Sequence, residues 1–160
     1  MTVSVQTEIE IARPPADVAA YACDPDRAPE WYRNIKAVRW ESPPPLAVGT
    51  RLAFVARFLG RPLSYTYEVT ELVPAARFVM RTAEGPFPME TTYTWEEMPN
   101  GSTRMTLRNR GDPTGFSKTA APLVARAIKR ANQADLRRLK HILERRADSG
   151  RSEPAMSRQP

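Results

Sequence analysis

Residues 114–144 read TGFSKTAAPLVARAIKRANQADLRRLKHILE. Apolar residues recur here every three or four positions, which predicts an amphipathic helix that begins at about Thr114. Roughly 30 residues at about 1.5 Å each give a length of about 45 Å, enough to cross a small sheet. Pro122 either kinks this helix or begins its main segment. The apolar stripe comprises Phe116, Ala120, Leu123, Val124, Ala127, Ile128, Ala131, Leu139, Ile142 and Leu143.

The chain before this helix alternates apolar and polar residues with a period of two, which predicts strands. In the first strand Val3, Val5, Ile9 and Ile11 share one face. Residues 14–32 interrupt the alternation, and their prolines and aspartates suit two short helical segments. The six further predicted strands cover residues 35–40, 50–58, 63–70, 77–81, 89–96 and 104–108.

The turns between these strands are short. Asn100-Gly101 is the strongest hairpin signal, and Gly60-Arg61-Pro62 and Pro74-Ala75-Ala76 also turn the chain. Connections of this length favour antiparallel neighbours. We therefore expect an α+β fold in which a curved, seven-stranded antiparallel sheet wraps around the long helix. The space between sheet and helix readily becomes a pocket for an apolar molecule.

Bulk composition fits one globular domain. The 160 residues are 41% hydrophobic and 26% charged. We expect a ligand-binding domain over residues 1–147 and a disordered basic tail over residues 148–160. The sequence has no apolar run of membrane-spanning length, and residues 1–10 lead us to expect no secretory signal. With Cys23 as the single cysteine, no intrachain disulfide can form, and we expect a cytoplasmic location.

The net charge of +6 is concentrated near the end of the chain. Residues 114–144 hold 7 Lys and Arg against 2 Asp and Glu. A solvated outer helix face explains this excess most simply. The alternative is a weak contact of the basic helix and tail with an acidic surface.

Candidate catalytic groups are few. His141 is the single histidine and Cys23 the single cysteine, so zinc sites and Ser-His-Asp or Cys-His arrangements are disfavoured. Cys23 is interpreted as a small apolar core residue, and no Gly-rich phosphate loop is present. We expect no catalytic residue, no metal and no cofactor.

Polar groups in phase with apolar ones indicate the pocket lining. Tyr65, Tyr67, Thr91, Tyr93 and Asn109 are expected to point toward the helix, either for structural hydrogen bonds or to orient a ligand. The pair Trp31 and Tyr32 either packs a corner or gates the pocket mouth. The predicted lining is Phe54, Tyr65, Tyr67, Met80, Met89, Thr91, Tyr93, Met105, Asn109, Ala120 and Val124.

Several short motifs, taken in order, carry a family resemblance. They are Ala12-Arg13-Pro14-Pro15-Ala16-Asp17-Val18, Asp24-Pro25 followed by Pro29-Glu30-Trp31-Tyr32, Val48-Gly49-Thr50, Tyr67-Glu68-Val69-Thr70-Glu71-Leu72, and residues 101–107. Together they resemble the START-like or SRPBCC (helix-grip) superfamily, and within it the polyketide cyclase/dehydrase and lipid transport group.

The resemblance implies a sheet that grips the C-terminal helix over a deep cavity. Members include carriers of apolar molecules and aromatase/cyclases, and the fold alone does not choose between them. We expect binding or transport of a hydrophobic or aromatic small molecule, lipid or polyketide-like. The alternative is a cofactor-independent aromatase/cyclase or dehydratase that uses Tyr65, Tyr67 or Tyr93 as acid or base and Asn109 as a carbonyl anchor.

Overall fold

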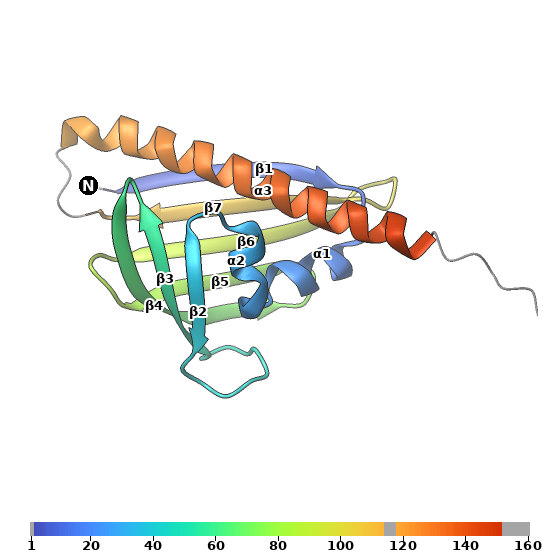
Figure 1. The fold of residues 1–160 in the computed structure, drawn as a ribbon, viewed down its shortest axis with the longest axis horizontal. Coiled ribbons are helices and arrows are strands. Elements are labelled where there is room, and N and C mark those ends of the chain that lie inside the picture. The colour runs from blue at the N-terminus through green and yellow to red at the C-terminus, as the bar shows by residue number, and fades with distance from the viewer. Residues whose placement is uncertain (1, 114–117, 152–160) are drawn as a thin grey trace, which may run out of the picture.

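The computed structural model describes residues 2–113 and 118–151, which form one curled sheet, one long helix and several short helical segments (Figure 1). The strands are β1 (Val3–Ile11), β2 (Ile35–Trp40), β3 (Arg51–Phe58), β4 (Arg61–Val73), β5 (Arg77–Glu84), β6 (Met89–Glu97) and β7 (Thr103–Gly111). The helices are α1 (Pro15–Ala22), α2 (Ala28–Trp31) and α3 (Ala121–Arg151), with 3₁₀ turns η1 (Pro25–Arg27) and η2 (Lys118–Ala120).

The sheet is antiparallel throughout, with strand order β1-β7-β6-β5-β4-β3-β2. Irregularities in the β4–β5 register, at Thr66/Tyr67 and Val69/Glu71, locally increase bend and twist. As a result β2 and β3 cross the direction of β6 and β7 steeply, and the sheet curls into a half-barrel (Figure 1). The predicted α+β helix-grip architecture is confirmed.

Two hairpins show how the turns are built. Gly101 has φ of +82°, as the Asn100-Gly101 signal predicts, and the backbone N–H of Ser102 donates to Asn100 Oδ1 at 3.1 Å. Between β3 and β4 the turn lies at Leu59-Gly60, with φ of +49° and +76°. The predicted Gly60-Arg61-Pro62 turn is therefore shifted, because Arg61 and Pro62 pair with Phe58 and Arg57 as the start of β4.

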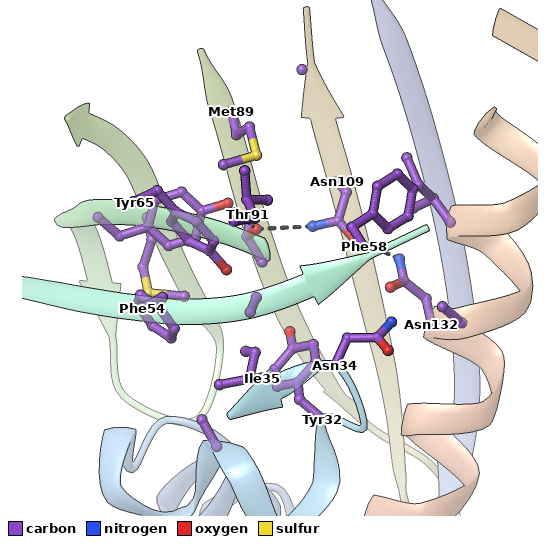
Figure 2. Close-up of a pocket in the computed structure, with 18 of the residues that line it drawn as sticks. Tyr32, Asn34, Ile35, Phe54, Phe58, Tyr65, Met89, Thr91, Asn109 and Asn132 are labelled. Atoms are coloured by element: carbon purple, nitrogen blue, oxygen red, sulfur yellow. Dashed lines mark hydrogen bonds between the residues drawn. The ribbon is translucent and has the colours of Figure 1, made fainter. Parts of the chain in front are cut away.

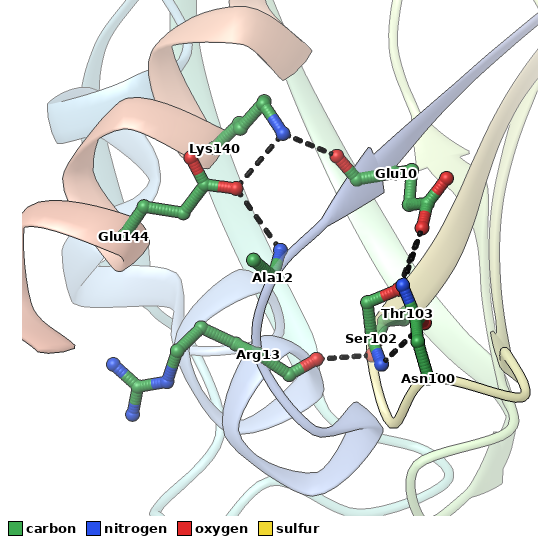
Figure 3. A network of polar contacts seen from close by, with 8 residues as sticks. All are labelled: Glu10, Ala12, Arg13, Asn100, Ser102, Thr103, Lys140 and Glu144. Carbon is green, nitrogen blue, oxygen red and sulfur yellow. Dashed lines mark hydrogen bonds and ion pairs between the residues drawn. The ribbon is translucent and has the colours of Figure 1, made fainter.

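The C-terminal half of α3 is held against the core and the end of β1. Leu136, Leu139 and Leu143 are buried between helix and sheet. Figure 3 shows the polar side of this contact, where Glu144 Oε1 accepts from the backbone N–H of Ala12 at 3.0 Å and from Lys140 Nζ at 2.8 Å. This half of the helix is therefore an anchor.

The N-terminal part of α3 differs from the prediction. Pro122 lies in the first turn and so begins the helix, where its missing N–H costs nothing. Leu123, placed on the apolar stripe, is 68% exposed. At the other end α3 continues to Arg151, into the segment predicted as tail, while Phe116 and residues 152–160 lie outside the described residues.

Candidate functional site

A cavity of about 360 Å³ lies between the concave face of the sheet and the N-terminal half of α3. Apolar and aromatic side chains of β3 to β6 form a large part of its wall, and Figure 2 shows Phe54, Tyr65 and Met89 projecting into it. Of the predicted lining, the wall contains Phe54, Tyr65, Tyr67, Met80, Met89, Thr91, Tyr93, Asn109 and Val124, together with Tyr32.

Three predicted site residues lie outside this wall. Met105 is fully buried beside Ile9 and Trp95, at the end of the sheet that the anchored half of α3 covers. Ala120 belongs to η2, whereas α3 first reaches the cavity at Val124. Trp31 is fully buried against Tyr32, with ring centroids 3.9 Å apart, so it packs the core and is not at a mouth.

A chain of hydrogen bonds runs through the cavity wall from sheet to helix. The hydroxyls of Tyr67 and Thr91 are 2.9 Å apart, and Asn109 Nδ2 donates to Thr91 Oγ1 at 2.9 Å. Asn132 Nδ2, from α3, donates to Asn109 Oδ1 at 2.5 Å. Figure 2 shows this line of polar groups crossing from β6 through β7 to the helix. The bonds fix the orientation of Asn109 and join α3 to the sheet at mid-cavity.

The aromatic residues of the wall form two groups. Phe54 and Tyr65 stack with centroids 5.3 Å apart, and Tyr67 meets Tyr65 edge-on at 4.9 Å. Across the cavity, the hydroxyl of Tyr32 hydrogen-bonds that of Tyr93. Flat apolar faces on one side and hydroxyls on the other suit an aromatic or alicyclic guest.

Burial keeps the tyrosines and the thiol of the cavity protonated. It raises the pKa of Tyr67 and of Cys23 to about 12, and it raises the pKa of Tyr65 and of Tyr93 well above the ordinary value. A tyrosinate base or a thiolate nucleophile is therefore disfavoured near neutral pH.

Sequence reasoning missed the buried acidic group of the cavity wall. Asp135 on α3 lines the wall at 3% exposure and accepts the backbone N–H of Arg33 at 3.1 Å. Desolvation raises the pKa of its carboxyl to about 6, although Arg33 and Arg138 oppose the rise. The sequence carried a signal, because Asn132 and Asp135 precede Leu139 at helical spacing on the buried stripe. Other wall residues that were not predicted include Asn34, Ile35, Phe58, Leu63, Phe87, Ile128 and Asn132.

The described residues contain no group of three or more His, Cys, Asp or Glu side chains that could hold a metal ion. None of the helices in the described part of the chain is long and apolar enough to cross a membrane.

Comparison with known proteins agrees with this architecture. The family model for polyketide cyclase/dehydrase and lipid transport proteins matches residues 2–144. The chain belongs to this family. No curated protein matches it.

Solved structures of the same fold are distant in sequence. A START superfamily protein from Mycobacterium smegmatis has TM-score 0.76 and 14% identity, over 89% of this chain and 97% of that one. A protein from Thermus thermophilus has TM-score 0.75 and 20% identity, over 88% and 96%. The Zhui aromatase/cyclase from Streptomyces sp. R1128 has TM-score 0.75 and 15% identity, over 92% and 96%. At these identities the likeness establishes the fold alone.

Proposed function

We propose that this family member binds a hydrophobic or aromatic small molecule, lipid or polyketide-like, in the cavity under α3 and carries it without chemical change. The observation that supports this most is the apolar, aromatic-lined cavity of about 360 Å³. Ligand pockets commonly measure roughly 300–1,000 Å³, so this one suits a compact guest. Each 100 Å² of apolar ligand surface removed from water contributes about 2.5 kcal/mol.

Filling the cavity tests this proposal. Met89 projects into the cavity from β6, so Met89→Trp occupies the guest's space and is expected to abolish binding of a fluorescent apolar probe (Figure 2). The matched control is Val55→Trp, because Val55 lies on β3, is 46% exposed and is absent from the wall. Circular dichroism checks that both variants fold. Unchanged probe affinity in folded Met89→Trp contradicts this placement of the binding site.

A cyclase or dehydratase is the alternative, since one solved relative is named as an aromatase/cyclase. Two observations favour the carrier. The cavity tyrosines are held protonated by burial, so they can donate a proton but serve poorly as bases. The amide of Asn109 is already engaged by Thr91 and Asn132, which leaves one N–H for a carbonyl and fixes its direction. Turnover that Tyr67→Phe or Tyr93→Phe removes, with binding retained, would favour the enzyme.

Contact of the basic helix and tail with an acidic surface stays a prediction. The side chains of Arg126, Lys129, Arg130 and Arg137 on α3 are exposed. If they bind an acidic surface, retention on vesicles rich in phosphatidylserine falls steeply with added salt and with the paired change Lys129→Glu and Arg137→Glu. Retention that is independent of salt contradicts the contact.

A further inference from the structure

Two hydrogen-bond acceptors lie side by side in the wall of the cavity. Asn132 and Asp135 are one helical turn apart on α3, so both point from the same face of the helix. Both line the cavity, at 6% and 3% exposure. The surrounding wall is mainly apolar, so a polar pair in this place is unusual and calls for partners.

The protein satisfies only part of the hydrogen-bonding capacity of Asp135 and Asn132. Asp135 Oδ1 accepts the backbone N–H of Arg33, and Asn132 donates through Nδ2 to Asn109. Among residues 2–113 and 119–148, no side chain or backbone group donates to Asp135 Oδ2 or to the amide oxygen of Asn132. The side-chain amide of Asn34, also in the wall, makes no hydrogen bond within the same residues. Neither oxygen is fully buried, which leaves both open to a donor group of a guest.

The groups that face Asp135 do not supply a donor from the cavity side. The hydroxyls of Tyr32 and Tyr93 bond each other. The positive charges near the carboxylate are those of Arg33 and Arg138, and the Arg138 guanidinium donates to the backbone oxygen of Glu30. Within the described residues, none of these groups donates to the open acceptors, so a donor group of the guest can bind there.

We propose that the guest is an apolar skeleton carrying one hydrogen-bond donor, an amine or a hydroxyl, that is bound by Asp135 and Asn132. This inference rests on the proposed function and narrows its ligand class. An ammonium can donate to both open acceptors and a hydroxyl to one of them, while the rings of the skeleton lie against Phe54, Tyr65 and Met89. An anionic guest is disfavoured because its charge would face the carboxylate of Asp135.

Matched naphthalenes test the inference. Isothermal titration calorimetry at pH 7.5 compares 1-methylnaphthalene, 1-naphthalenemethanol, 1-naphthylmethylamine and 1-naphthoate, which share one ring system. We expect the amine or the alcohol to bind at least about tenfold more tightly than the methyl compound, since hydrogen bonds to charged groups are the stronger ones. We expect naphthoate to bind most weakly. If the affinity of the amine rises between pH 5 and 7.5, the donor group of the guest is an ammonium. If the alcohol binds more tightly than the methyl compound by the same factor at both pH values, the donor group is a hydroxyl.

Variants assign the effect to this pair. Asp135→Asn should remove the gain of the amine, and Asp135→Leu should remove the gain of both donors, each gain being measured against 1-methylnaphthalene in the same variant. If either change at Asp135 prevents folding, Asn132→Ala tests the same pair, because it removes the second acceptor. The control is Asp17→Asn, at an exposed carboxylate of α1 outside the wall.

The outcomes separate the two proposals. If the methyl compound binds as tightly as both donors, or if the donor gain survives in Asp135→Leu, this inference is overturned and the apolar binding site stands. If none of the four compounds binds, the proposed function falls with it.

Discussion

At the scale of single residues, Asp135 links the cavity to the stability of the fold. Its carboxyl has a pKa of about 6 when folded, against about 3.9 in an unfolded chain, because burial disfavours the charged form. Folding therefore favours the protonated acid. The stabilising contribution is complete below about pH 4 and is lost as the pH rises through about 6.

This predicts a pH-dependent difference between the wild type and Asp135→Asn, whose amide does not titrate. From pH 4.5 to 8 the wild type should lose on the order of 2 kcal/mol of unfolding free energy relative to the variant. Urea denaturation at both pH values measures this difference, and Asp17→Asn serves as the control. An equal effect of Asp135→Asn at both pH values contradicts the burial of an ionisable carboxyl.

Apart from Val124 on α3, the predicted lining residues that lie in the wall belong to strands whose residues alternate between two faces. Phe54, Tyr65 and Tyr93 fall in the cavity wall because period two determines their face. Alternation does not determine which part of a strand reaches the cavity. Met105 lies on the expected face of β7, but it is four residues away from Asn109, which lines the cavity. The role of Asp135 could not be predicted from its residue type, because a carboxylate within a basic run gives by itself no signal of burial.

At the scale of elements, α3 has two halves with different tasks. The anchor half is tied to the end of β1 by Glu144, which accepts from Ala12 and Lys140, and by Lys140 Nζ, which donates to the backbone oxygen of Glu10 at 2.7 Å (Figure 3). The cavity half has polar contact with the sheet mainly through Asn132 and Asn109. Stability and binding should therefore respond to different parts of one helix.

Glu144→Ala tests this division. The change leaves the N–H of Ala12 without its acceptor and removes one of the two acceptors of the Lys140 ammonium, and we expect a loss of about 1 kcal/mol in unfolding free energy. Affinity for the fluorescent apolar probe should not change. Gln133→Ala, at an exposed position on the same helix, corrects for helix propensity. A loss no larger than that of Gln133→Ala, or a loss of probe affinity, contradicts the division.

The sequence predicted which helices and strands are present better than it predicted where they begin and end. The Asn100-Gly101 turn is found because a positive φ is needed there and the residue pair supplies it. In the turn at Leu59-Gly60 the leucine has a positive φ, a conformation that its own preference disfavours. The turn lies there because Arg61 and Pro62 pair with β3. The start of α3 at Ala121 depends on Pro122, whose two possible roles the pattern alone could not separate.

At the scale of the whole molecule, a curled antiparallel sheet and one anchored helix enclose a space that side chains do not fill. The order of the strand and helix patterns predicted this arrangement, because a sheet with one apolar face and a long amphipathic helix bury each other. The size of the hollow could not be predicted, since it depends on how far β2 and β3 curl round and on which half of α3 packs tightly.

The central claim is that this hollow receives an apolar guest. A crystal structure with 1-bromonaphthalene, collected at the bromine absorption edge, tests it most directly. We predict an anomalous bromine peak inside the cavity, between the rings of Phe54 and Tyr65 and the side chains of Met89 and Val124. A cavity filled by rearranged side chains, or a peak found only on the outer surface of the molecule, would contradict the account.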